Sequence, residues 1–142
     1  MIRLSKSVYL AGSTATLAEI DRARTWRRAL VSHGVEVTST WVDKVAAAAN
    51  VGNPRDKTPL QRLAISAQCL REVDRAGSLW MLVPPVDAPT RGAWGESCYA
   101  HALARPLVFS GDTKQSVFCA LGDEYESDED AFSRVLGLVG VR

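Results

Sequence analysis

The chain has 142 residues, of which 46% are hydrophobic and 23% are charged, so it is long and apolar enough to form a domain with a sizeable core. Its 17 basic and 16 acidic side chains give a formal net charge of +1, which provides no general field for a polyanion and argues against a nucleic-acid polymer as partner. No apolar stretch reaches bilayer length, and the apolar run at the N-terminus is too short for a signal peptide. We therefore expect a single domain over residues 1–142, cytoplasmic and without a membrane partner.

Three cysteines, Cys69, Cys98 and Cys119, are widely spaced and contain no Cys-x-x-Cys pair. Their number and spacing argue against a disulfide framework and against a zinc site, and they favour a reducing compartment. We expect neither a metal ion nor a cofactor.

The first part of the chain predicts a strand, a helix and a second strand. Residues 7–11 form a short β-rich run. Thr16 and Glu19 then make a capping box, and apolar residues recur at helical spacing up to His33. Residues 35–40 alternate and are β-branched, as is typical of a strand.

The middle of the chain is less regular. Over residues 43–57 an alanine run favours a short helix, which the following glycine, asparagine and proline must end. This segment is either an excursion over the sheet edge or a surface loop without function. Thr58, Pro59 and Gln61 mark a clear helix start. The apolar stripe of that helix consists of Leu60, Leu63, Ala67, Leu70 and Val73.

The second half continues the alternation of strands and helices. Residues 78–83 are a buried strand, a proline-rich loop follows, and a helix begins near Gly92 with Glu96 in its first turn. Residues 107–110 are the fourth strand, and short helices are expected over residues 116–121 and after Ser127.

Strands that alternate with helices predict a single-domain α/β fold of the flavodoxin or Rossmann-like type. We expect a parallel sheet of four or five strands in the order 2-1-3-4-5, with helices on both faces. The topological switch point then lies between the first and third strands. The loops that meet there are residues 12–16 and residues 84–95, and Glu96 lies at the edge of this crevice.

The loop after the first strand offers donors to an anion. Gly12, Ser13 and Thr14 precede a helix N-terminus, and Arg91 could add a guanidinium across the crevice. Ordinary helix capping explains Ser13, and Thr16 at the helix start, equally well. Neither a Walker loop nor a Gly-x-Gly-x-x-Gly fingerprint is present.

A carboxylate such as Glu96 suits attack on an anomeric carbon, where it can form a covalent glycosyl intermediate. Tyr99 follows three residues later and can hydrogen-bond it. Trp94, Trp41 and Tyr9 could stack on a base or a sugar, although such residues more often belong to a core. A lone carboxylate near a helix start is also often only a dipole partner.

Two segments, VYLAGS at residues 8–13 and GAWGESCYAHALARPLVF at residues 92–109, resemble the nucleoside 2-deoxyribosyltransferase superfamily. This group includes the 2'-deoxynucleoside 5'-monophosphate N-glycosidases. Its hallmarks are a first strand that ends in a small residue and Gly-Ser or Gly-Pro, and a Gly-x-x-x-Glu-x-x-x-Ala segment before a Gly-Lys-Pro and the next strand. The match covers residues 8–110, with gaps.

The resemblance implies that Glu96 is the nucleophile on C1' of a (deoxy)ribosyl group. Tyr9, Gly12 and Ser13 would line the base and phosphate side, and Arg91 would lie near the phosphate. It also implies that Trp41 contacts the base. Gly92 and Trp94 complete the expected substrate-binding set.

The chain departs from the family pattern at two aspartates. Cys69 and Gly77 stand where relatives carry them, which leaves the general acid unassigned. Asp74 and Asp87 are substitutes, and either is equally readable as a surface acid. The segment before Pro106 also lacks the usual Gly-Lys.

We therefore expect cleavage or transfer of the N-glycosidic bond of a nucleoside or nucleoside 5'-monophosphate. One alternative is a binding module of the same fold that senses a nucleotide without turning it over; another is an NAD-glycohydrolase-like enzyme. The resemblance implies a homodimer or larger homo-oligomer.

Overall fold

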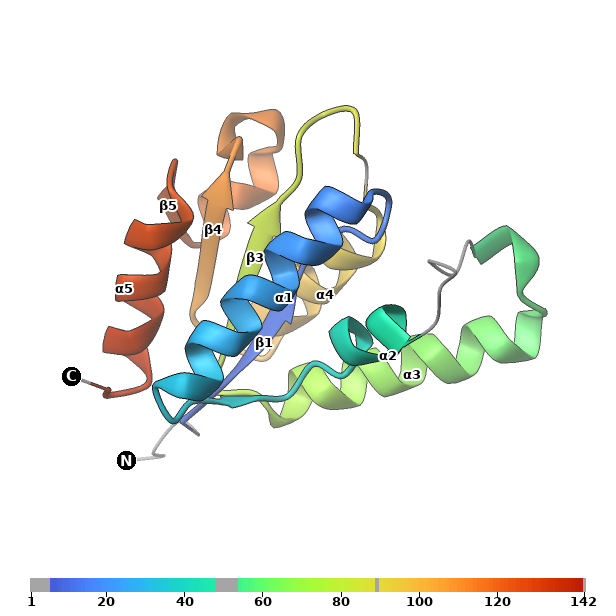
Figure 1. Ribbon diagram of the computed structural model, residues 1–142, viewed down its shortest axis with the longest axis horizontal. Coiled ribbons are helices and arrows are strands. Elements are labelled where there is room, and N and C mark those ends of the chain that lie inside the picture. The colour runs from blue at the N-terminus through green and yellow to red at the C-terminus, as the bar shows by residue number, and fades with distance from the viewer. Residues whose placement is uncertain (1–5, 48–53, 89, 142) are drawn as a thin grey trace.

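The computed structural model describes residues 6–47, 54–88 and 90–141, which form a single α/β layer structure (Figure 1). Its sheet has five strands in the order β2-β1-β3-β4-β5, and every pair is parallel. The expected fold class and strand order are confirmed. The strands are β1 (Ser7–Ala11), β2 (Glu36–Val37), β3 (Ser78–Val83), β4 (Leu107–Gly111) and β5 (Asp123–Tyr125).

The helices follow the capping signals of the sequence closely. Thr16, Thr58 and Ser127 each accept a backbone N–H in the first turn of their helix, as N-cap side chains do. The α-helices are α1 (Leu17–Ser32), α2 (Trp41–Ala47), α3 (Pro59–Arg75), α4 (Gly92–Ala102) and α5 (Asp128–Leu138). Three short 3₁₀ helices are η1 (Pro54–Asp56), η2 (Thr113–Gln115) and η3 (Val117–Leu121).

Alternate residues of the buried strands point to opposite faces of the sheet and form two cores. Val8 and Leu10 of β1 belong to the core that packs against α1 and α5, whereas Tyr9 and Ala11 belong to the core beneath α3 and α4. Figure 1 shows α1 and α5 on the near face and α4 behind the sheet. Successive side chains of β1 therefore alternate between the α1 side and the α4 side of the sheet.

The apolar stripe expected on α3 is largely exposed. Leu60, Leu63 and Leu70 are 75%, 63% and 38% exposed, and only Val73, near the C-terminal end, is fully buried. The physical reason is visible in Figure 1, where α3 extends well beyond the edge of the sheet, so its first turns have no strand beneath them.

Three smaller differences concern element boundaries. The second strand is two residues long, not six, because Thr38 and Ser39 leave the strand while keeping contact with β1 through the Thr38 N–H to Val8 and the Leu10 N–H to Ser39 Oγ. The helix expected over the alanine run begins earlier, at Trp41, and residues 48–53 lie outside the described part. Glu96 is the fifth residue of α4, so it lies in the second turn, not the first.

Candidate active site

The Glu96 side chain is held inside the protein on the sheet-facing side of α4. Ala93, Ser97 and Ala100, which share this side of the helix, are all buried. The Oε2 atom of Glu96 is buried and has no hydrogen-bond partner within the described residues. A Cβ at Gly92 would lie 3.6 Å from Glu96 Oε1, an ordinary van der Waals distance, so this carboxylate oxygen lies beside the glycine one turn earlier. A buried carboxylate oxygen without a partner is costly, so this group calls for an explanation.

Tyr9 brings a hydroxyl to the same place from the middle of β1. The side chain is fully buried, and its hydroxyl lies beside the Glu96 carboxylate and the Cys69 thiol. That hydroxyl also lacks a hydrogen bond of good geometry. Burial, reinforced by the neighbouring Glu96 charge, raises the pKa of Tyr9, so the phenol stays protonated. It is therefore a donor that can serve either Glu96 or a ligand.

Cys69 and Glu72 complete this cluster from α3, three residues apart on one helix face. Cys69 is half-buried. Burial and the charge of Glu96 raise the pKa of its thiol against the opposing effects of the Tyr9 hydroxyl and Lys44. Cys69 stands where the family resemblance places an aspartate, so the structure puts that substituted position next to Glu96.

Glu72 is a functional candidate that the sequence analysis missed. It is 5% exposed, and its carboxylate accepts the Thr40 backbone N–H at 3.0 Å and the Thr40 hydroxyl at 2.5 Å. The Gln68 amide donates in turn to Thr40 Oγ1 at 3.2 Å. The only available signal was its spacing from Cys69 and Val73 on the inner face of α3.

The environment of Glu96 changes its titration. Burial raises its pKa to about 7; the Tyr9 hydroxyl opposes this rise, and the negative charge of Glu72 adds to it. No cation is among the groups that shift this pKa, and neither Glu96 nor Glu72 belongs to an ion pair within the described residues. Glu96 is therefore poised to change charge near neutral pH.

Trp41 closes the neighbouring end of β1. Its indole N–H donates to the Leu10 carbonyl at 2.8 Å, and a Cβ at Gly12 would lie 3.5 Å from its ring. Thr40, the residue before it, is the one held by Glu72. The Glu72–Thr40 contact thus fixes the start of α2 and places the Trp41 ring over Gly12.

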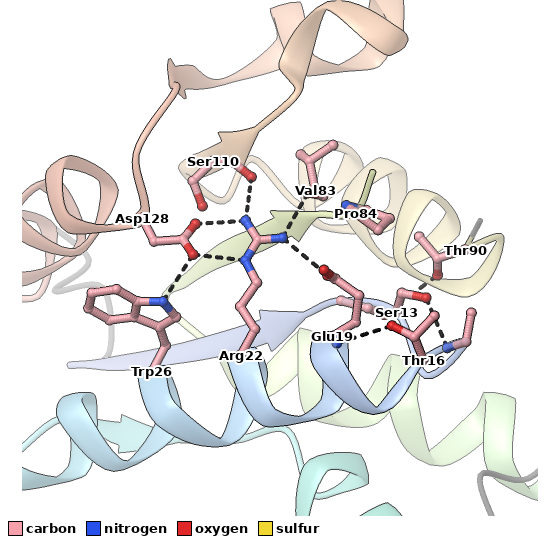
Figure 2. Close-up of polar contacts among 12 residues, drawn as sticks. Ser13, Thr16, Glu19, Arg22, Trp26, Val83, Pro84, Thr90, Ser110 and Asp128 are labelled. Atoms are coloured by element: carbon pink, nitrogen blue, oxygen red, sulfur yellow. Dashed lines mark hydrogen bonds and ion pairs between the residues drawn. The ribbon is translucent and has the colours of Figure 1, made fainter. Parts of the chain in front are cut away.

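The loop after β1 lies against the loop before α4, as the topology predicts. The Thr90 hydroxyl is 3.5 Å from the Gly12 carbonyl, and both Thr90 and Ser13 appear at this junction in Figure 2. Ser13 is buried and accepts the Ala15 N–H at 3.0 Å, whereas Thr14 is half-buried. Arg91 is exposed at the start of α4.

Four other residues expected in the site are either exposed on the surface or packed against other parts of the core. Asp74 and Asp87 are exposed, and Asp74 lies two residues after Glu72, on the opposite face of α3. The tyrosine beside Glu96 is Tyr9; Tyr99 is half-buried against the core beneath α4. Trp94 stacks on Phe109 with ring centroids 6.4 Å apart.

The opposite face of the sheet carries a second polar cluster, centred on Arg22 of α1 (Figure 2). Its guanidinium donates to the Val83 carbonyl at 2.8 Å and the Ser110 carbonyl at 3.1 Å, at the carboxyl ends of β3 and β4. It also contacts Asp128 at 2.7 Å and Glu19 at 3.1 Å. All these bonds leave Arg22 fully engaged, so this cluster serves the fold. The sequence analysis did not single out Arg22, because an arginine within an amphipathic helix gives no sign that it will reach the strand ends.

Asp128 is the anionic centre of this Arg22 cluster. Burial alone would raise its pKa, but hydrogen bonds from Arg22 and Ser110, the Arg22 charge and the Trp26 indole together lower it. The Trp26 bond is 3.0 Å long. Asp128 therefore stays charged, in contrast to Glu96.

Within the described ranges, no helix combines the length and apolarity needed to cross a membrane, and no group of three or more His, Cys, Asp or Glu side chains is arranged to hold a metal ion.

Comparison with known proteins adds a fold relative. No protein-family model matches the sequence, and no curated protein matches it. The crystal structure of a conserved protein from Enterococcus faecalis V583 is similar, with a TM-score of 0.61 and 13% sequence identity over 94% of this chain and 98% of that chain. At this identity the likeness supports the fold alone.

Proposed function

We propose that this protein cleaves or transfers the N-glycosidic bond of a (deoxy)nucleoside or nucleoside 5'-monophosphate, with Glu96 as nucleophile. The observation that carries the proposal is the buried Oε2 atom of Glu96, which has no hydrogen bond of good geometry within the described residues, beside the Tyr9 hydroxyl. A buried carboxylate with a raised pKa and no cation beside it is typical of a site that a ligand completes.

The chemistry follows from the ionised form of Glu96. Its carboxylate attacks C1', the C1'–N bond breaks, and the base leaves with the bonding electron pair. Water, in hydrolysis, or a second base, in transfer, then displaces Glu96 from C1'. The Tyr9 hydroxyl donates to whichever carboxylate oxygen does not attack, and so orients the nucleophile.

The surrounding residues supply binding contacts in this proposal. Trp41 offers a ring face for the base at the end of β1, where it covers Gly12. Ser13 and Thr14 lie in the adjacent loop. Arg91, exposed at the start of α4, is available to a 5'-phosphate. Asp74 and Asp87 remain candidate proton donors only if a substrate-bound state brings them closer to the base.

The test is release of free base from a panel of nucleosides and nucleoside 5'-monophosphates. Replacing Glu96 with glutamine should lower kcat/KM by about 10³-fold or more, because the amide is a poor nucleophile. Glu126→Gln, a matched change at an exposed glutamate after β5, should leave kcat/KM unchanged. A 2-fluoro-sugar nucleoside should leave a glycosyl adduct on Glu96 in peptide mass spectrometry. Activity that survives Glu96→Gln would reject the nucleophile.

A second candidate is a nucleotide-sensing module of the same fold. It is favoured by Cys69, since its thiol replaces the carboxyl group that the family resemblance expects beside Glu96, and burial raises the pKa of that thiol. Ligand-induced thermal stabilisation by nucleotides, without base release over long incubation, would establish sensing in place of catalysis.

We also propose that the protein is a homodimer that buries the exposed face of α3. Leu60, Leu63 and Leu70, which share one side of the helix, are 75%, 63% and 38% exposed, and such a patch typically marks an interface. Light scattering should give twice the monomer mass, and Leu63→Gln should give the monomer mass. A monomeric native protein would exclude this interface.

The three cysteines are free, which is the state maintained in the cytoplasm, and we propose that location. Localisation of a tagged protein in its native cell tests it.

A further inference from the structure

Within the described residues, no cation pairs with either of the two inward carboxylates of the Glu96 cluster. Glu72 is 5% exposed, and the Oε2 atom of Glu96 is buried. Buried carboxylates in folded proteins are normally paired with cations, because the desolvation cost is otherwise severe. The Arg22 cluster on the opposite face obeys this rule, since its buried acids, Glu19 and Asp128, both contact the guanidinium. The exception at Glu96 therefore requires a reason.

The groups that face Glu96 come from every element packed around it. Tyr9 reaches it from β1, Cys69 and Glu72 from α3, and Gly92 from α4 itself. Lys44 of α2 influences Cys69, but its side chain is exposed. In the part of the chain that the structure describes, none of the groups acting on Glu96 is a cation, and Glu72 is held by hydrogen bonds from Thr40, which carry no charge.

The same cluster lacks an evident proton donor for a leaving base. The Tyr9 phenol and the Cys69 thiol both have raised pKa values, so each is a weak acid. A neutral nucleoside base needs a proton as it departs, whereas a base that is already cationic leaves as a neutral molecule. A site without a strong acid thus suits a cationic base.

We propose that the site is built for N-glycosides whose base carries a positive charge, of the N-ribosylpyridinium class, with Glu72 and Glu96 supplying the countercharge. This inference rests on the proposed function and narrows its substrate. Glu96 forms a bond to C1' as the C1'–N bond breaks, and the bonding pair neutralises the ring nitrogen. Water then attacks C1', Glu96 leaves as a carboxylate, and the second water proton goes to solvent. The sum is N-glycoside cation plus water giving free sugar, neutral base and one proton.

The test compares two ligands of nearly identical shape. Nicotinamide riboside is a permanent cation, and its dihydro form is neutral. At pH 8, where Glu96 is ionised, the cation should bind about tenfold or more tightly than the neutral ligand in isothermal titration calorimetry. Replacing Glu72 with glutamine removes one charge but keeps acceptors for Thr40, and it should reduce this preference by about threefold or more. Glu126→Gln should preserve the preference.

Base release separates this inference from the proposed function. Preferential binding of the cation with nicotinamide release, lost in Glu96→Gln, supports both. Preferential binding without release supports the cation site and rejects the catalysis. Glu96-dependent cleavage of neutral nucleosides, without preference for the cation, keeps the proposed function and overturns the inference. Equal binding of the two ligands, or an unchanged preference in Glu72→Gln, also overturns it.

Discussion

The two faces of the sheet treat buried acids in opposite ways. Beneath α1 and α5, Asp128 contacts Arg22 at 2.7 Å, and the pKa of Asp128 is lowered. Beneath α3 and α4, Glu96 has no cation among the groups acting on it, and its pKa is raised to about 7. One sheet thus carries a satisfied ionic cluster around Arg22 and an unsatisfied one around Glu96 on its opposite faces. The first cluster stabilises the fold, and we propose that a ligand completes the second.

Breaking the satisfied cluster should give the largest effect. Arg22→Met removes every bond of the guanidinium and leaves Asp128 buried without its cation, so the free energy of unfolding should fall by about 3 kcal/mol. Arg24→Met is the control, because Arg24 is half exposed and lies 3.8 Å from Asp21; it should cost less than about 0.5 kcal/mol. Urea unfolding at pH 7 measures both, and equal effects would contradict the assignment of the Arg22 cluster to stability.

Removing the charge of Glu96 should raise the free energy of unfolding, whereas removing Arg22 should lower it. The pKa of Glu96 is higher in the folded protein than in the unfolded chain, so between about pH 4.5 and about pH 7 the folded state holds more protons than the unfolded state. Stability that comes from this group is therefore lost across that window. Glu96→Gln should raise the unfolding free energy by about 2 kcal/mol at pH 8, with the gain shrinking towards pH 5. Urea unfolding across this pH range, with Glu126→Gln as control, measures the effect. Destabilisation of the protein by Glu96→Gln at pH 8 would contradict the account.

The pH dependence of catalysis sharpens the role of Glu72. Because the nucleophile must be ionised, kcat/KM should rise with pH around a midpoint near 7. Removing the Glu72 charge should move that midpoint to lower pH, since Glu72 helps to raise the pKa of Glu96. The measurement is the pH profile of base release for the native protein and Glu72→Gln. An unchanged midpoint would show that the two carboxylates are not coupled.

The exposed half of α3 should give the smallest change in monomer stability. Leu63 is 63% exposed, so Leu63→Gln should alter the unfolding free energy by less than about 0.5 kcal/mol at protein concentrations where dimers dissociate. Unfolding measured at low concentration checks this. A larger loss would mean that Leu63 packs within its own chain.

Much of the fold follows from local signals that sequence carries directly. Thr16, Thr58 and Ser127 predict helix starts because a cap is a contact between residues three apart. The exposure of the apolar stripe of α3 could not be predicted, because periodicity does not reveal where the sheet ends. The shortness of β2 also depends on tertiary contacts, here the Ser39 hydroxyl bound to the Leu10 N–H.

The residues of the candidate site likewise include some that the sequence identifies and some that only the tertiary structure reveals. Glu96 could be selected from the motif around it, and Trp41 and Gly12 from the strand ends. Cys69 could be selected only through the family pattern. Glu72 could not be selected, because its importance depends on α3 packing against α4, and a glutamate in a charged helical sequence looks like a surface residue. The Tyr9 hydroxyl likewise gains its role only when the parity of β1 directs it to the α4 side.

The most direct test of the central claim is the titration of Glu96 itself. Carbon-13 NMR of the labelled side-chain carboxyl, assigned with Glu96→Gln, reports its protonation as a function of pH. A buried carboxylate beside Glu72, without a cation, should titrate with a midpoint near 7. A midpoint near the ordinary 4.5 would show that Glu96 is solvated or paired, and would contradict both the proposed nucleophile and the cation site.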